Sequence, residues 1–84
     1  MTEDRLRQAV LDQLGDIAPE IDLESIDADA NLRDEYDLDS MDFLNFVIGL
    51  HQRLGVDIPE ADYPRLSTVS ACITYLAAKC GARS

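Results

Sequence analysis

The chain has 84 residues, 46% of them hydrophobic, and its 17 acidic and 7 basic residues give a formal net charge of −10. A chain of this length has room for one domain with a modest core, so residues 1–84 are expected to fold as a single unit. The charge argues against binding to nucleic acid or anionic membranes and favours protein partners with basic patches. No apolar run is long enough for membrane insertion and no secretory leader is recognisable, which favours a cytoplasmic protein.

The acidic residues are unevenly distributed along the chain. Between Asp16 and Asp39 there are ten acids and a single base, Arg33, which leave this segment with a net charge of −9. From Ser40 to Ser84, four acids balance four bases. The acidic segment is therefore either a solvated loop, which is common, or a docking surface beside Ser40.

The first predicted helix covers residues 2–14, with Thr2 as a suitable N-cap and Gly15 as its expected end. Apolar residues recur every four positions along it, at Leu6, Val10 and Leu14. Residues 16–38 keep no helical period, and Pro19 interrupts the chain. This stretch predicts a long loop with at most one helical turn, held to the core by scattered aliphatic side chains.

The second predicted helix covers residues 40–54 and ends at Gly55. Asp39 is a suitable N-cap, and Asp42, three residues later, completes a capping-box pattern. The residues expected to face the core are Leu44, Phe46, Val47, Ile48, Leu50 and Leu54.

The last third of the chain predicts an extended segment over residues 56–59 and a short helix over 60–65, made irregular by Pro64. Ser67 is a candidate N-cap for a last helix that Gly81 ends. Its apolar stripe consists of Val69, Cys72, Ile73, Leu76 and Cys80. These elements predict an all-α fold: a bundle of three long helices and one short irregular helix, with a long loop between the first and second helices.

The cysteines and the single histidine offer no catalytic or metal site. Cys72 and Cys80 lie eight residues apart on one predicted helix, about 12 Å along its axis at 1.5 Å per residue, which is too far for a disulfide. Two reduced thiols are typical of a cytoplasmic protein. His51 has no nucleophile or carboxylate pair at a readable spacing, so we interpret it as a surface residue and expect no enzyme.

Ser40 is the first candidate for a functional site. A serine in the first turn of a helix lies beside unpaired backbone N–H groups, which together with the helix dipole stabilise a phosphate ester. Serine is also frequent at helix starts for structural reasons alone, and without further observations that reading is the stronger one.

A second candidate is the run from Asp27 through Asp29 to Asn31, which imitates the start of a calcium-binding EF-hand loop. The sixth loop position should be glycine and is Leu32, and the twelfth should be glutamate and is Leu38. Without the sharp turn and the bidentate ligand, we expect no metal site here.

Three stretches of the chain resemble the acyl carrier protein family. Residues 38–42, Leu-Asp-Ser-Met-Asp, open a helix as the Asp-Ser-Leu motif of that family does. Residues 53–59 resemble the family's stretch that ends in Ile-Pro, and residues 66–69 resemble its Ile-Thr-Thr-Val. The three stretches are in register without gaps, so the resemblance covers nearly the whole chain.

The resemblance implies that a phosphopantetheinyl transferase moves 4′-phosphopantetheine from coenzyme A to Ser40. The thiol of this arm would then hold an acyl group as a thioester, in a monomeric carrier that does no catalysis itself. Asp39 and Asp42 would help the transferase to recognise the site, and Met41 would make an apolar contact beside the arm. The other implied partners are enzymes that load, transfer or elongate acyl groups and dock through basic patches.

The chain departs from the family pattern along the second helix. Family members commonly carry several acids there, whereas this chain has only Asp42. We therefore expect partner recognition to shift toward the acids of residues 27–37, including Glu35 and Asp37, and toward the Asp39–Asp42 end of the helix.

Three further departures suggest a specialised carrier rather than the housekeeping one. Phe43 replaces a small polar residue and is expected either to turn inward or, as the slightly favoured alternative, to contact partners. Asp37 replaces glycine before the motif and tolerates a left-handed backbone better than most residues. Pro64 is expected to shorten the third helix. The pathway implied is fatty-acid, lipid or polyketide-type synthesis.

Other functions remain open at this point. A carrier of D-alanyl or aminoacyl groups uses the same arm, although residues 36–40 lack the glycine pair that is usual in peptidyl carriers. An acidic interaction domain of the same fold without the arm is a second alternative. A calcium sensor is a third, and the EF-hand departures argue against it.

Overall fold

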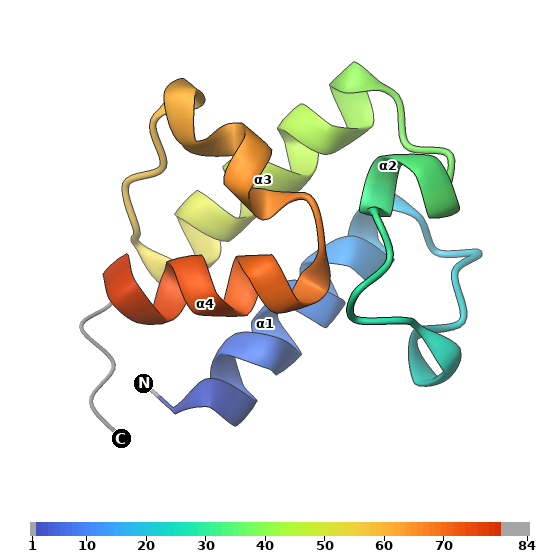
Figure 1. Cartoon of the computed structure of the whole chain (residues 1–84), viewed down its shortest axis with the longest axis horizontal. Coiled ribbons are helices and arrows are strands. Elements are labelled where there is room, and N and C mark those ends of the chain that lie inside the picture. The colour runs from blue at the N-terminus through green and yellow to red at the C-terminus, as the bar shows by residue number, and fades with distance from the viewer. Residues whose placement is uncertain (1, 80–84) are drawn as a thin grey trace.

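The computed structural model describes residues 2–79, and within this range every regular element is helical. The long helices α1, α3 and α4 account for most of the structure (Figure 1). The elements in chain order are α1 (Glu3–Ile17), η1 (Leu23–Ser25), α2 (Leu32–Glu35), α3 (Ser40–Leu54), η2 (Glu60–Leu66) and α4 (Val69–Lys79), η marking a 3₁₀ helix. The predicted all-α bundle is confirmed. None of the helices in residues 2–79 is both long and apolar enough to cross a membrane.

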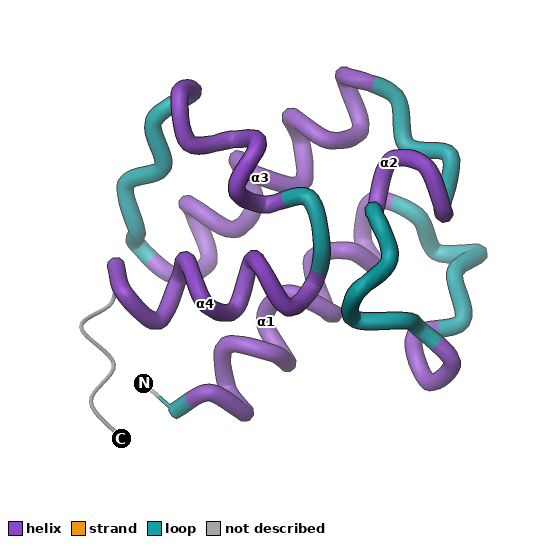
Figure 2. Tube along the Cα trace, viewed as in Figure 1, coloured by secondary structure: helices purple, strands orange, loops and turns teal. Residues whose placement is uncertain are grey.

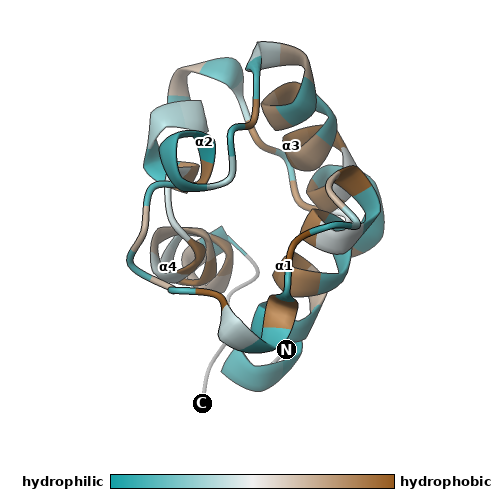
Figure 3. Cartoon of the chain, turned by 90° about the vertical axis from the view of Figure 1, so that its right-hand side faces the viewer, coloured by the Kyte–Doolittle hydropathy of each residue, from teal (hydrophilic) through white to brown (hydrophobic). Residues whose placement is uncertain are grey.

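The core lies among the three long helices, where α1 packs against both α3 and α4, and α4 packs against η2. Figure 2 shows the long loop between α1 and α3 covering one end of this bundle. Hydrophobic parts of the helices face one another across the interior (Figure 3). The largest fully buried side chains are Phe46, Leu6, Leu14, Leu32, Leu50, Leu66, Leu76, Val10, Val47, Val69 and Cys72. Burial of this apolar surface is the main stabilising contribution in so small a domain.

Helix α1 is longer than its sequence pattern predicted. Gly15 was expected to end it, but the helix continues to Ile17, and the Ala18 N–H closes it with a hydrogen bond to the Leu14 carbonyl at 2.9 Å. The reason is tertiary. A Cβ atom on Gly15 would lie 3.1 Å from the Leu23 side chain, so this glycine makes room for the loop instead of ending the helix.

The loop between α1 and α3 contains two short helical pieces, η1 and α2, where at most one turn was predicted. Helix α2 begins because the Asn31 side chain accepts hydrogen bonds from the N–H groups of Arg33 and Asp34, each at 3.0 Å. Fully buried Leu32 anchors α2 to the core, and its N–H donates to the Ser67 carbonyl at 2.8 Å. The loop is thus tied to the start of α4.

Both ends of α3 are set by local contacts that the sequence predicted. Asp39 Oδ1 accepts from the Asp42 N–H at 2.8 Å, and Asp42 Oδ2 accepts from the Asp39 N–H at 3.4 Å, which is the capping box. At the other end, Gly55 takes a left-handed conformation with φ of +65°, and its N–H donates to the His51 carbonyl at 2.8 Å.

Ile48 was predicted to face the core, but its side chain is 40% exposed. The buried stripe of α3 consists of Phe43, Phe46, Val47 and Leu50, at i, i+3, i+4 and i+7. Ile48 lies about 100° around the helix from Val47 and therefore turns to solvent. Helix α3 has more apolar residues than its one buried stripe can accommodate.

Helix α4 is capped by Thr68, not by Ser67 as predicted. The Ala71 N–H donates to Thr68 Oγ1 at 2.9 Å, whereas the Ser67 carbonyl accepts from Leu32. Val69, Cys72, Ile73 and Leu76 form the predicted buried stripe. The expected contribution of Cys80 and the expected stop at Gly81 lie outside the described residues.

The segment before α4 is the short, irregular helix that Pro64 predicted, and it is the 3₁₀ helix η2. It is tied to α4 by the Tyr75 hydroxyl, which donates to Asp62 Oδ2 at 2.6 Å. Tyr75 is only 3% exposed. Burial, and then this hydrogen bond, raise the pKa of Tyr75 from 10.0 to about 12, and burial raises the pKa of Cys72 from 9.0 to about 12.

These two groups predict loss of stability in alkaline solution. In the unfolded chain Cys72 and Tyr75 release their protons near pH 9 and pH 10, whereas the folded chain retains them to about pH 12. Their contribution to the free energy of unfolding is therefore complete below pH 9 and declines as the pH rises from there. Urea unfolding from pH 8 to 11 should show this decline, and Tyr75→Phe should make it shallower. Equal slopes for the two proteins would contradict the assignment to Tyr75.

Gly55 offers a test of the end of α3. A Cβ atom at this position would meet no other atom within 4 Å, so any effect of Gly55→Ala comes from the backbone conformation. The left-handed conformation should cost alanine roughly 1 kcal/mol of stability. Gly55→Asn should lose less than Gly55→Ala in denaturant titration, because asparagine tolerates this conformation better. An alanine variant as stable as the parent would refute the argument.

Candidate functional site

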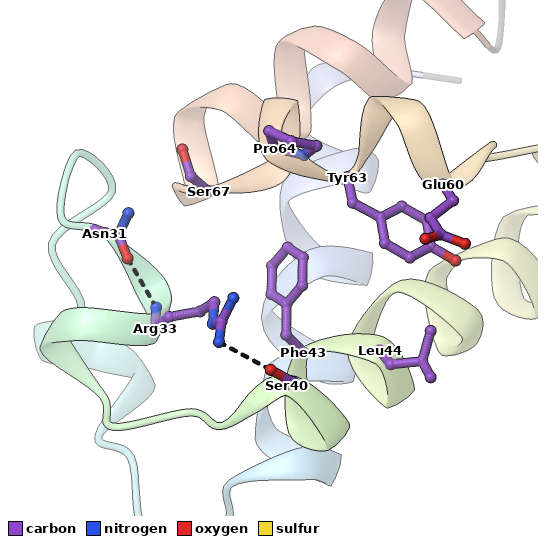
Figure 4. A pocket seen from close by; sticks show the side chains of 9 residues that line it. All are labelled: Asn31, Arg33, Ser40, Phe43, Leu44, Glu60, Tyr63, Pro64 and Ser67. Carbon is purple, nitrogen blue, oxygen red and sulfur yellow. Dashed lines mark hydrogen bonds between the residues drawn. The ribbon is translucent and has the colours of Figure 1, made fainter.

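Ser40 is the first residue of α3 and follows the acidic segment, residues 16–39, of which residues 18–39 form the acidic loop. Its side chain is exposed. The Oγ atom accepts a hydrogen bond from Nη2 of Arg33 at 3.1 Å, which Figure 4 shows as a dashed line. The hydroxyl is therefore accessible to a reagent from solution and already lies beside a positive charge.

The first turn of α3 is suited to carry an anionic group on Ser40. The side chains of Asp39 and Asp42 are occupied in the capping box. Within residues 2–79, the N–H groups of Ser40 and Met41 have no hydrogen-bond partner. They carry the partial positive charge of the N-terminus of a 15-residue helix.

A cavity of about 550 Å³ opens beside Ser40, between α2, α3 and η2. Figure 4 shows the side chains that surround it. Aromatic and aliphatic groups form one part of its wall, and polar groups form the rest. The lining residues are Asn31, Arg33, Ser40, Phe43, Leu44, Glu60, Tyr63, Pro64 and Ser67. The cavity therefore offers both apolar contact and hydrogen bonds to a group attached to the serine.

Phe43 is buried, and the favoured expectation that it is exposed for partner contact is wrong. It is 8% exposed and packs against Phe46, with ring centroids 6.2 Å apart, and edge-on against Tyr63 at 6.4 Å. The Arg33 guanidinium lies 5.9 Å from its ring centroid. Phe43 turns inward because η2 supplies Tyr63 as a partner, a long-range contact that the sequence of α3 does not contain. Its edge forms part of the cavity wall.

Met41 is 63% exposed on the first turn of α3, beside Ser40. This agrees with the prediction of an apolar group available for contact next to the serine. Asp37 has φ of +57°, the left-handed conformation that its residue type was expected to tolerate. Asp37 lies in the short connection between α2, which carries Arg33, and α3, which begins at Ser40.

Carboxylates of the acidic loop gather around a second cavity of about 420 Å³. Glu35 and Asp37 line it from the α2 side. The other carboxylates of its lining are Glu20, Asp22 and Asp27. The fold thus brings acids that are distant in sequence to one face, next to the end of α3 that carries Ser40.

The EF-hand-like side chains are engaged in hydrogen bonds within the protein. Asp27 Oδ1 accepts from the Asp29 N–H at 2.9 Å, Asp29 Oδ1 accepts from the Ser70 hydroxyl at 3.1 Å, and Asn31 caps α2. Across residues 2–79, no three His, Cys, Asp or Glu side chains are placed to hold a metal ion. His51 is exposed, and its Nδ1 lies 2.6 Å from the Val56 carbonyl, a structural contact at the end of α3.

Two contributors to the site were missed by sequence reasoning. The sequence distinguishes Arg33 only as the single base of the acidic loop, and this was the one feature that could have pointed to it. Tyr63 had no signal, because its position depends on the packing of η2 against α3. The assembled residues fit a phosphate ester on Ser40: an accessible hydroxyl, a neighbouring guanidinium, two unpaired N–H groups and an adjoining cavity.

Comparison with known proteins agrees with this geometry. The model of the family "phosphopantetheine attachment site" matches residues 4–76. The acyl carrier protein of Lactobacillus johnsonii is 32% identical over 76 residues, which cover 90% of this chain and 94% of that protein. The acyl carrier protein of Lactobacillus acidophilus is 28% identical over the same shares of the two chains.

Two solved structures share the fold. A putative acyl carrier protein from Anaplasma phagocytophilum superposes with a TM-score of 0.82 at 23% identity, covering 94% of this chain and 92% of that one. The acyl carrier protein from Enterococcus faecalis superposes with a TM-score of 0.79 at 24% identity, covering 94% and 99%. With a family match over most of its length and a relative at 32% identity, the chain belongs to the acyl carrier protein family, whose members are carriers rather than enzymes and hold a covalently attached 4′-phosphopantetheine.

Proposed function

We propose that Ser40 is the residue that receives 4′-phosphopantetheine and that the chain carries acyl groups on this arm. The observation that supports the assignment most directly is the exposed Ser40 hydroxyl on the first turn of α3, hydrogen-bonded to Arg33 at 3.1 Å. It lies inside the matched region, residues 4–76. When bound, the arm supplies a terminal thiol that holds the acyl group as an activated thioester.

The residues around the serine have two tasks in this proposal. The cavity beside Ser40 receives the attached group, with Phe43, Leu44 and Tyr63 offering apolar contact. Asn31 and Ser67 offer hydrogen bonds at its edge. The capped start of α3 presents Ser40 at the surface, where an enzyme can reach it.

Acyl carrier proteins interact with a phosphopantetheinyl transferase and with acyl-handling enzymes. For this chain we propose recognition through Asp39, Met41 and Asp42 at the start of α3, together with Glu35 and Asp37 in the acidic loop. Support comes from the exposed Met41 and from the five carboxylates around the second cavity. An acidic face of this kind attracts basic partner surfaces and speeds their encounter.

The proposed role is that of a specialised, cytoplasmic carrier in fatty-acid, lipid or polyketide-type synthesis. Its support is the exposed surface of α3, which carries no acid beyond Asp42. The residues exposed toward the end of the helix are instead His51, Gln52 and Arg53. Partners that require an acidic helix along its whole length would dock poorly, which favours a dedicated set of enzymes.

Attachment is tested by intact mass. Incubation with coenzyme A, magnesium and a broad-specificity phosphopantetheinyl transferase should add one phosphopantetheine to the parent protein and none to Ser40→Ala. Both proteins should show the same circular dichroism, because the exposed hydroxyl contributes little to packing. Addition to the alanine variant would move the site elsewhere. No addition to either protein, with a second transferase as well, would favour the unmodified interaction domain.

Docking through the acidic loop is tested with a charge-matched pair of variants. Glu35→Gln/Asp37→Asn removes two carboxylates near Ser40, and Asn is compatible with the left-handed position 37. Glu3→Gln/Asp4→Asn removes two from the start of α1. The first variant should be modified roughly 3–10-fold more slowly at low salt, since each lost surface ion pair is worth about 0.2–1 kcal/mol. The second should match the parent. Equal rates for both variants would exclude Glu35 and Asp37 from docking.

A further inference from the structure

Arg33 stands apart from the other charged groups of the acidic loop. It is the only base among residues 16–39, where ten acids surround it in sequence. Even so, the one ion pair found among residues 2–79 joins Arg53 to Asp16, at 3.0 Å. The guanidinium of Arg33 instead points to the Ser40 hydroxyl (Figure 4). A cation among many carboxylates that is paired with none of them leaves its charge available for another anion.

The position of Arg33 is held from both ends of α2. The Asn31 side chain accepts from the Arg33 N–H at 3.0 Å, and the Arg33 carbonyl accepts from the Leu38 N–H at 3.2 Å. Leu32 and Leu38 are buried on either side and fix α2 to the core. The side chain then lies over the Phe43 ring, 5.9 Å from its centroid. Arg33 is therefore directed at Ser40 before any group is attached.

A phosphodiester on Ser40 places a new negative charge next to an acidic surface. Asp39 and Asp42 flank the serine, and the segment before it, residues 16–39, has a net charge of −9. The ester oxygen derives from the Oγ atom that already accepts from Nη2 of Arg33. A guanidinium has five N–H donors, so further donors remain for the phosphate oxygens, which it binds with two parallel hydrogen bonds.

We propose that Arg33 is the residue that binds the phosphodiester of the arm, offsets the repulsion from the neighbouring carboxylates and positions the arm over Phe43. This inference rests on the proposed attachment at Ser40. It adds a phosphate-binding residue outside the serine motif, on a different helix, and ties α2 to the attached arm.

The test compares each protein with its own modified form. Parent, Arg33→Gln, Arg33→Lys and Arg7→Gln are prepared in unmodified and modified form, with modification verified by intact mass. Arg7 is exposed on α1 and controls for the loss of one positive charge. The measured quantity is the change in Tm caused by modification, at low salt and at 0.5 M salt. Failure of the proposed function appears first, as no added mass, and is thereby distinguished from failure of this inference.

At low salt, the change in Tm should be roughly 2–5 °C less favourable in Arg33→Gln than in the parent, as expected for loss of one exposed charge pair in a domain of this size. Arg7→Gln should match the parent, and the change in Tm of Arg33→Lys should fall between those of the parent and Arg33→Gln. High salt should reduce the difference. In NMR spectra of the parent, the guanidinium N–H resonances of Arg33 should shift on modification, while those of Arg7 stay in place.

Equal changes in Tm for Arg33→Gln, Arg7→Gln and the parent, or an unmoved Arg33 resonance, would overturn the proposal. So would a slower modification of Arg33→Gln with an unaltered change in Tm, because that result assigns Arg33 to contact with the transferase and not with the arm.

Discussion

Helix α3 starts at Ser40 because Asp39 and Asp42 satisfy each other's backbone N–H groups. This reciprocal cap fixes which residue occupies the first turn and leaves the serine side chain exposed to solvent. The buried stripe that follows, from Phe43 to Leu50, then sets the rotation of α3 against α1 and α4. Exposure of the serine and burial of the core are thus two results of one helix start, and a shift of that start by one residue would disturb both.

Acidic residues are concentrated in one region of this fold, as they are in one segment of the sequence. The acids of the long loop collect on one face around the second cavity, and the only base of that loop turns away from them toward Ser40. Because α2 is anchored through Leu32 and through its hydrogen bond to Ser67, this arrangement does not depend on the surface charges themselves. The packed loop can therefore keep one cation beside Ser40, the proposed attachment point, while its carboxylates gather around the second cavity.

The cavity beside Ser40 depends on contacts between elements that are distant in sequence. Phe43 of α3 meets Tyr63 of η2 edge to face, and η2 is in turn held to α4 by the hydrogen bond from Tyr75 to Asp62. Pro64 keeps η2 irregular, so this segment approaches α3 as a short 3₁₀ helix. The shape of the space available to an attached group is consequently linked to the packing of the last helix.

The sequence by itself determined the all-α class, both ends of α3, the stripe on α4 and the candidate serine, because helix periodicity and capping depend on residues within about four positions of one another. Tertiary structure alone decided that α1 runs past Gly15, that Thr68 caps α4, that Phe43 turns inward and Ile48 outward, and that Arg33 reaches Ser40. Three of these depend on which distant element occupies the adjoining space: Leu23 beside Gly15, Leu32 on Ser67, Tyr63 against Phe43. Such neighbours come together only when the chain packs, so local sequence patterns cannot predict them.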